Sequence, residues 1–108
     1  MKNQTIYEEV SRGFNRKLAF LENIMVAVCD FTDGPTENPD PKHSHPHEQI
    51  TYVAEGEVFF FMGEEKFHLK KGDVITIPSG VPHSIQKLCN KIILVDCFSP
   101  VRKDFLQK

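Results

Sequence analysis

Three histidines and one glutamine in this chain have the types and spacing of a transition-metal site. His43, His45 and Gln49 occupy odd-numbered positions, which in a strand place their side chains on one face. His83 lies in a separate segment and is the candidate fourth ligand. Imidazole nitrogens and an amide oxygen suit several divalent first-row metals, including Zn, Ni, Mn, Fe and Co. Direct ligation by Gln49 is favoured over a hydrogen bond to a ligand histidine, which is the alternative.

A neutral donor set has a consequence for the substrate. Imidazole and amide groups add no negative charge, so the full charge of a divalent ion would remain uncompensated. That charge favours the binding and polarisation of an anionic substrate. Two other histidines are given lesser roles: His47 is expected at the rim of the site, and His68 on a surface strand.

A second group of candidate residues lies near the C-terminal end of the sequence. Within residues 91–98, alternation places one carboxylate on an otherwise apolar face, which consists of Ile92, Leu94, Asp96 and Phe98. A carboxylate among apolar neighbours is costly unless it is paired or used in function. Arg102 follows the Ser99-Pro100 turn and can fold back towards it. A catalytic or substrate-contacting Asp96 is therefore favoured, and a structural ion pair between Asp96 and Arg102 is the alternative.

The histidines fall in two motifs that together resemble those of the cupin family. In residues 43–56, a His-x-His pair is followed four residues later by Gln49 and seven residues after that by Gly56. In residues 72–83, a glycine is followed after five residues by Pro-x-Gly and then by His83. The short connection over residues 57–71 is similar to that of small single-domain cupins.

The cupin resemblance carries several expectations. It implies one domain over residues 1–108, folded as a small antiparallel jelly-roll barrel of the RmlC-like type, and a homodimer. It also implies that the metal is held by His43, His45, Gln49 and His83. The sequence departs from the common pattern at two positions: Gln49 replaces a frequent Glu, and Lys87 stands where an Asn often follows the second motif.

The C-terminal group narrows the resemblance. The pattern Asp-x-Phe-Ser-Pro-x-Arg from Asp96 to Arg102, beside His-Ser-His-Pro-His-Glu-Gln, resembles the KdgF-type cupins of pectin and alginate breakdown. That family converts cyclic 4,5-unsaturated uronates into linear ketonised sugars. The resemblance implies a sugar-acid substrate, catalytic roles for Asp96 and Arg102, and substrate binding by Phe98 and Arg102. A metal-dependent cupin dioxygenase and a non-catalytic binder of small ligands such as sugars remain the alternatives, because cupins host many functions on one fold.

Composition agrees with a small globular protein. The chain has 108 residues, of which 40% are hydrophobic and 26% are charged, enough for one modest core. A net charge of −2 gives no reason to expect nucleic acid or an anionic membrane as a partner. No segment has the pattern of a signal peptide or a membrane span. Three cysteines without CxxC spacing favour reduced thiols and a cytoplasmic location.

Short β-rich runs separated by turn residues predict an all-β fold. The loop over residues 32–41, rich in Pro, Asp and Gly, is expected to form part of the rim of the site, and residues 100–106 have a weak helical pattern. The expected strands cover residues 6–10, 14–21, 23–31, 49–54, 57–62, 66–69, 74–77, 81–87 and 91–98.

Overall fold

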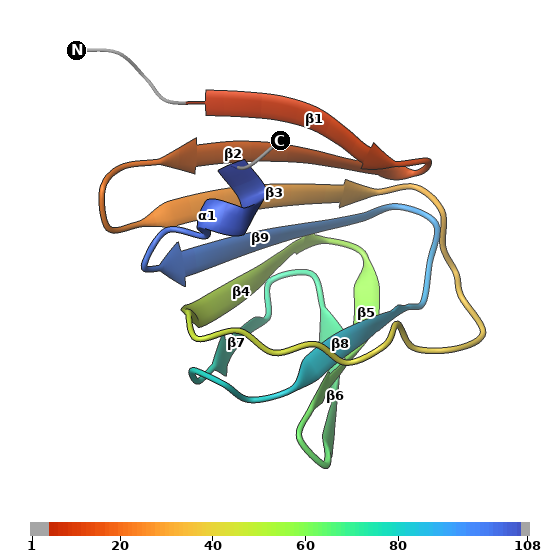
Figure 1. The fold of residues 1–108 in the computed structure, drawn as a ribbon. Helices are drawn as coiled ribbons and strands as arrows, with labels where there is room; N and C mark the ends of the chain where they lie inside the picture. The colour runs from red at the N-terminus through yellow and green to blue at the C-terminus, as the bar shows by residue number, and fades with distance from the viewer. Residues whose placement is uncertain (1–4, 107–108) are drawn as a thin grey trace.

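The computed structural model describes residues 5–106, so the predicted domain bounds 1–108 extend at both ends beyond the described residues. Its regular structure is almost entirely strand (Figure 1), which confirms the all-β prediction. One short helix, α1, follows the last strand, as the weak helical pattern of the tail indicated. The elements are β1 (Thr5–Ser11), β2 (Phe14–Phe20), β3 (Met25–Phe31), β4 (Glu48–Glu55), β5 (Glu57–Met62), β6 (Glu65–Lys70), β7 (Val74–Ile77), β8 (His83–Lys87), β9 (Ile92–Ser99) and α1 (Lys103–Leu106).

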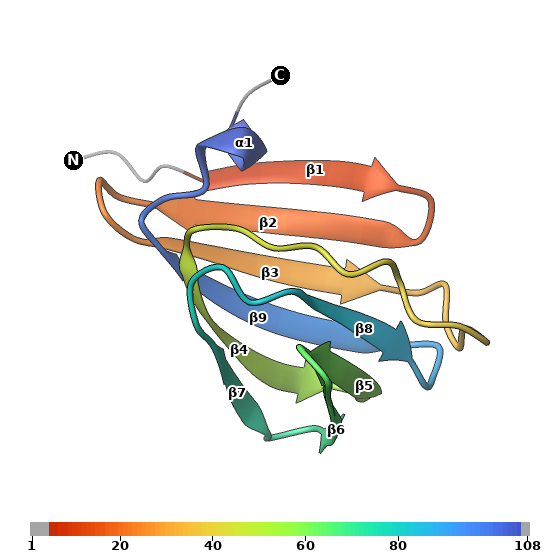
Figure 2. The same ribbon diagram turned by 60° about the horizontal axis from the view of Figure 1, so that its bottom comes forward.

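The described strands form two antiparallel sheets that share one core. The larger sheet has the order β1-β2-β3-β9-β4-β7, and the smaller has the order β6-β5-β8. From β4 to β9 the chain passes back and forth between the two sheets. The last strand, β9, returns to the larger sheet and lies between β3 and β4 (Figures 1 and 2). This arrangement confirms the predicted antiparallel jelly roll. The two sheets are not joined by backbone ladders into a closed barrel.

Strict alternation within the strands decides which side chains face the core. In β3, the odd positions from Met25 to Phe31 are buried and the even ones are only partly covered. In β4, Gln49, Thr51 and Val53 are buried, while the intervening side chains are more exposed. A side-chain period of two therefore places polar residues of β4 among apolar core residues.

The segment before β4 differs from the prediction. The argument that placed His43 and His45 on one strand face is wrong in detail, since β4 begins only at Glu48. His43 instead forms an isolated antiparallel bridge with His83, through N–H···O distances of 3.0 and 2.9 Å. Such a bridge fixes the two backbones side by side without a continuous strand. Of the described part of the chain, no helix is long and apolar enough to cross a membrane.

Candidate metal centre

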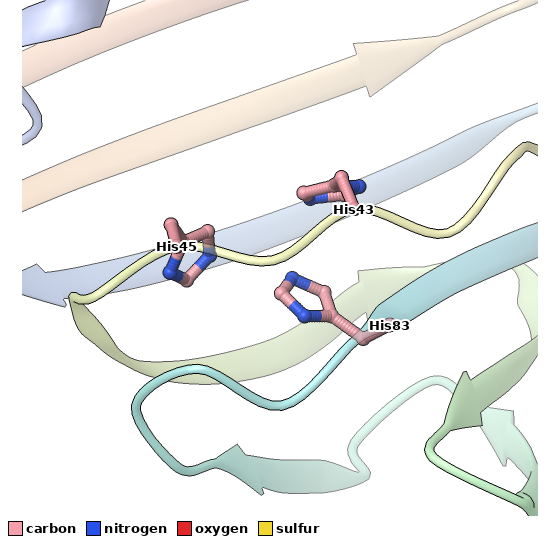
Figure 3. Close-up of side chains that lie close together, drawn as sticks. All are labelled: His43, His45 and His83. Carbon is pink, nitrogen blue, oxygen red and sulfur yellow. The ribbon is translucent and has the colours of Figure 1, made fainter.

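Three histidines from two separate segments meet at one point. One nitrogen from each of His43, His45 and His83 lies within 4.8 Å of the others. Figure 3 shows the three rings, two on the segment that leads into β4 and one at the start of β8. Imidazole nitrogens at such separations can bind a single divalent ion. These three residues are therefore positioned to hold a metal.

The backbone holds the two segments against each other on both sides of the histidines. Besides the bridge between His43 and His83, the amide of Gly80 donates to the carbonyl oxygen of His45 at 2.9 Å. The hydroxyl of Ser79 donates to the carbonyl oxygen of Pro46 at 2.7 Å. These bonds satisfy loop backbone groups and hold the backbones of the two histidine-bearing segments together.

Backbone carbonyls fix the tautomers of two of the histidines. Nδ1 of His45 donates to the carbonyl oxygen of His47 at 3.0 Å, and Nδ1 of His83 donates to that of Val81 at 2.9 Å. Since the carbonyls only accept, Nδ1 carries the proton in both rings and Nε2 can be a ligand atom. Nε2 of His83 is buried and has no hydrogen-bond partner in the described structure. An unpaired buried nitrogen of this kind fits a metal ligand.

Gln49 points its side-chain oxygen at the same place. Oε1 of Gln49 lies 3.0 Å from Nε2 of His45. With the proton of a neutral His45 on Nδ1, these two atoms are both acceptors, and their proximity requires a shared proton or a neighbouring cation. The donor chemistry thus fits a bound metal ion. The contact accommodates both direct ligation by Gln49 and a hydrogen bond to a ligand histidine.

The local electrostatics favour neutral imidazoles. Burial is the main cause that lowers the pKa of His43, and the electrostatic effects of the neighbouring His45 and Arg102 lower it further. Burial also lowers the pKa of His83, against the opposing effect of its hydrogen bond to Val81. Metal binding requires the unprotonated ring, so these shifts lessen the competition from protons.

A cavity of about 440 Å³ opens beside the histidines. Its walls include His43, Gln49 and His83 together with residues of the C-terminal part of the chain: Asp96, Phe98 and Arg102. The structure therefore brings the two groups of candidate residues into one pocket. Its volume lies in the range usual for small-molecule sites. His47 is excluded from the three-histidine group, although its ring lies 5.5 Å from that of His45.

The carboxylate of Asp96 is held by neutral donors. The hydroxyl of Thr51 donates to its Oδ1 at 2.7 Å, and the thiol of Cys29 lies 3.7 Å from its Oδ2. Burial raises the pKa of Asp96, although the hydrogen bonds and the charge of Arg102 act in the opposite direction. A carboxyl group in these surroundings exchanges a proton at higher pH than an ordinary Asp does.

Arg102 forms its ion pair with Asp104, and not with Asp96 as the alternative in the sequence analysis supposed. Its guanidinium donates to both carboxylate oxygens of Asp104, at 3.1 and 2.6 Å. It also lies over two aromatic rings, 5.2 Å from the centre of Phe98 and 4.1 Å from that of Phe105. The structural ion pair with Asp96 is not found among the described residues, so Asp96 is not explained as the partner of a buried arginine.

Sequence reasoning missed several residues that line the pocket or lie directly behind its wall. Thr51 is fully buried between Gln49 and Asp96, and Cys29 and Phe105 line the cavity. Only Thr51 carried a signal, because it shares the parity of Gln49 two positions earlier. Phe105 reaches the pocket, and Asp104 reaches Arg102, because of the path of the chain after Ser99, which no local pattern specifies.

The amino-acid sequence is similar to that of a known domain family and to that of a relative with a similar length. The cupin domain family matches residues 30–89 of the chain. The pectin degradation protein KdgF of Dickeya dadantii is 35% identical over 106 residues, which cover 96% of this chain and 94% of that protein.

Two solved structures also have folds similar to that of this chain. A structure of KdgF from a Halomonas species is similar with a TM-score of 0.81 and 28% identity, over 93% of this chain and 90% of that one. An RmlC-like cupin from Shewanella frigidimarina has a TM-score of 0.81 and 32% identity, over 94% of this chain and 89% of that one.

Proposed function

This chain belongs to the cupin family, and we propose that it is a metal-dependent enzyme that opens and ketonises 4,5-unsaturated uronates from pectin or alginate breakdown. The observation that carries the proposal is the shared cavity, in which Asp96, Phe98 and Arg102 face the candidate ligands His43, Gln49 and His83. The similarity to the pectin degradation protein KdgF along almost the whole chain supports the choice of substrate.

The metal site would consist of His43, His45, Gln49 and His83. A divalent first-row metal held there supplies a Lewis acid that polarises an oxygen of the substrate. The donor atoms are neutral, and the cavity also contains the cationic Arg102. An anionic sugar acid is therefore a better match to this pocket than a neutral sugar.

Arg102 is the proposed binding group for the uronate carboxylate. Its guanidinium binds the Asp104 carboxylate through two nitrogens, and the carboxylate of a uronate could take the same two hydrogen bonds in its place. Phe98 lines the same cavity next to Arg102 and is the proposed apolar contact for the sugar ring. These two contacts orient the ring towards the histidines.

Asp96 is the proposed acid–base group. The reaction moves protons without any redox step: the anomeric hydroxyl loses its proton as the hemiacetal opens, and C4 gains one as the enol becomes a ketone. The raised pKa of Asp96 brings its protonated form closer to neutral pH, which suits a carboxyl group that both accepts and donates. Arg102 contributes to catalysis by holding the substrate so that its reacting atoms lie next to Asp96.

The test follows the double bond of freshly lyase-generated unsaturated uronate by ultraviolet absorbance or proton NMR. Wild type, chelator-treated protein and Arg102→Ala are compared with a protein-free blank, because the ring can open unaided. We expect loss of the signal faster than in the blank, dependent on both metal and Arg102. A rate equal to the blank from protein with bound metal rejects the proposal. Oxygen consumption would then point to a dioxygenase, and tight sugar binding without turnover to a binding module.

We also propose that the protein is a cytoplasmic homodimer. Ile50, Tyr52 and Val74 are exposed on β4 and β7 of the larger sheet, where apolar side chains are costly in water. A second copy packed on this sheet would cover them. Light scattering coupled to size-exclusion chromatography measures the mass, and a monomer at micromolar concentration contradicts the dimer.

A further inference from the structure

A continuous series of close polar contacts connects the metal site to Asp96. Nε2 of His45 lies 3.0 Å from Oε1 of Gln49, and Nε2 of Gln49 donates to the hydroxyl of Thr51 at 2.8 Å. The same hydroxyl donates to Oδ1 of Asp96 at 2.7 Å. Thr51 thus contacts both the amide of Gln49 and the carboxylate of Asp96.

The fold fixes the position of Thr51. It lies two residues after Gln49 on the same face of β4, and it is directly opposite Asp96 in the pairing of β4 with β9. Its side chain is completely buried, with 0% exposure. Water therefore cannot easily replace the hydroxyl if it is removed, and Nε2 of Gln49 and Oδ1 of Asp96 would each lose a hydrogen-bond partner in the interior.

Because the hydroxyl of Thr51 has only one proton to donate, it can determine how the amide of Gln49 is oriented. A threonine hydroxyl has one proton and can accept on its lone pairs. When that proton is given to the carboxylate of Asp96, only acceptor capacity remains for Gln49, so the Gln49 amide must present its NH₂ group to Thr51. Its carbonyl oxygen is then turned towards the histidines, the orientation that a metal ligand needs.

We propose that Thr51 is a positioning residue that sets the orientation of the Gln49 amide towards the metal and holds the carboxylate of Asp96 in place. The part that concerns Gln49 depends only on the metal site, and the part that concerns Asp96 rests on the proposed function. The single hydroxyl of Thr51 would in this way orient both the candidate metal ligand Gln49 and the proposed acid–base group Asp96. Thr51 itself is not among the residues that line the cavity.

The test uses variants that separate the hydroxyl from the shape of the side chain. Thr51→Val keeps the branched shape without the hydroxyl, and Thr51→Ser keeps the hydroxyl. Thr76→Val is the matched control, because Thr76 is an exposed threonine on the neighbouring strand β7. Metal-free proteins are titrated with Co²⁺, and the visible absorption spectrum reports the ligand environment of the bound ion independently of activity.

We expect Thr51→Val to bind Co²⁺ about 10- to 100-fold more weakly, the usual effect of losing a group that orients a ligand, with an altered spectrum. Thr51→Ser and Thr76→Val should match the wild type. In uronate turnover, Thr51→Val should lower kcat with little change in KM, because Arg102 still binds the substrate carboxylate. Thr51→Ala provides a smaller replacement if the valine variant does not fold.

The outcomes separate the two proposals. Wild-type Co²⁺ affinity and spectrum in both Thr51→Val and Thr51→Ala overturn the role of Thr51, whatever the turnover. Altered Co²⁺ binding without uronate turnover by the wild type rejects the proposed function and retains the role of Thr51 at Gln49. If neither variant folds, NMR of the wild type decides: a Gln49 side-chain amide that exchanges with solvent as fast as free glutamine overturns the inference, and a protected one supports it.

Discussion

Arg102, which lines the cavity, forms a two-point ion pair with Asp104, two residues further along the chain. Two parallel N–H···O bonds are also the way in which arginine binds the carboxylate of a ligand. Asp104 therefore occupies the position that the uronate carboxylate is proposed to take. Its own pKa is lowered, chiefly by the hydrogen bond from Arg102, so it is charged and competes at neutral pH.

Removal of Asp104 should strengthen substrate binding. In Asp104→Ala the guanidinium of Arg102 is free, and we expect the KM for unsaturated uronate to fall by up to about fivefold. This limit follows from the roughly 0.2–1 kcal/mol that a partly exposed ion pair contributes. Lys103→Ala, on the same short helix, is the control and should leave KM unchanged. A higher KM in Asp104→Ala would mean that Asp104 holds Arg102 in its working position.

Metal binding should stabilise the fold through His83. At a Ni²⁺ concentration 100 times the Kd, a ligand that binds only the folded state adds about 2.7 kcal/mol of stability. For a domain of this size that corresponds to a rise in Tm of about 10–20 °C, and chelation should reverse it. Differential scanning calorimetry of metal-free protein with and without Ni²⁺ measures the shift.

The matched variants for this shift are His83→Ala and His68→Ala. His68 lies on β6, where it pairs with Glu57 away from the three histidines. We expect the Ni²⁺-induced rise in Tm to be lost in His83→Ala and kept in His68→Ala. Equal shifts in both variants would show that Ni²⁺ binds elsewhere.

Much of the fold follows from local sequence. Alternating apolar residues predicted strands over residues 23–31 and 91–98, and the structure has β3 and β9 there with ends that differ by at most two residues. Turn residues separated the strands correctly, because Gly and Pro impose their conformations locally. The segment from His43 to His47 was the exception: its shape depends on a backbone bridge to a distant part of the chain.

The site was less predictable where it depends on register between strands. Parity along one strand placed Gln49 and Asp96 on inward faces, but nothing local shows that Thr51 lies opposite Asp96. The partner of Arg102 was similarly hidden, because two carboxylates compete for it and the path of the chain after Ser99 decides between them. Local patterns identified the chemical groups, and long-range pairing determined their contacts.

Because the pKa of Asp96 is raised in the fold, the folding stability of the metal-free protein depends on pH. Because burial favours the protonated carboxyl, the folded state holds this proton more tightly than the unfolded state does. Full stability is therefore present below the ordinary pKa of Asp, 3.8, and part of it is lost as the pH rises through the higher pKa of the folded state. Asp96→Asn cannot ionise and should escape this loss.

Urea unfolding of chelator-treated wild type and Asp96→Asn, from acid to neutral pH, measures the difference. We expect the stability of Asp96→Asn relative to the wild type to increase with pH and then level off. A difference that stays constant across the range would show that Asp96 ionises equally well in the folded and unfolded states.

The glycines of the two cupin motifs should respond differently to alanine. Gly56 and Gly72 both have positive φ, 86° and 96°, so alanine is strained at either position, by about 1–2 kcal/mol. At Gly72 an added Cβ meets open space, whereas at Gly56 it would lie 2.4 Å from the carbonyl oxygen of Lys91 and 2.9 Å from Cγ1 of Ile92. The Lys91 carbonyl belongs to the backbone just before β9, and it cannot move without shifting that strand. We therefore expect Gly72→Ala to lose only the conformational cost in urea unfolding, and Gly56→Ala to exceed the roughly 0.5–3 kcal/mol of ordinary substitutions. Equal losses would mean that β9 moves aside at little cost, and that the first motif requires its glycine for the turn alone.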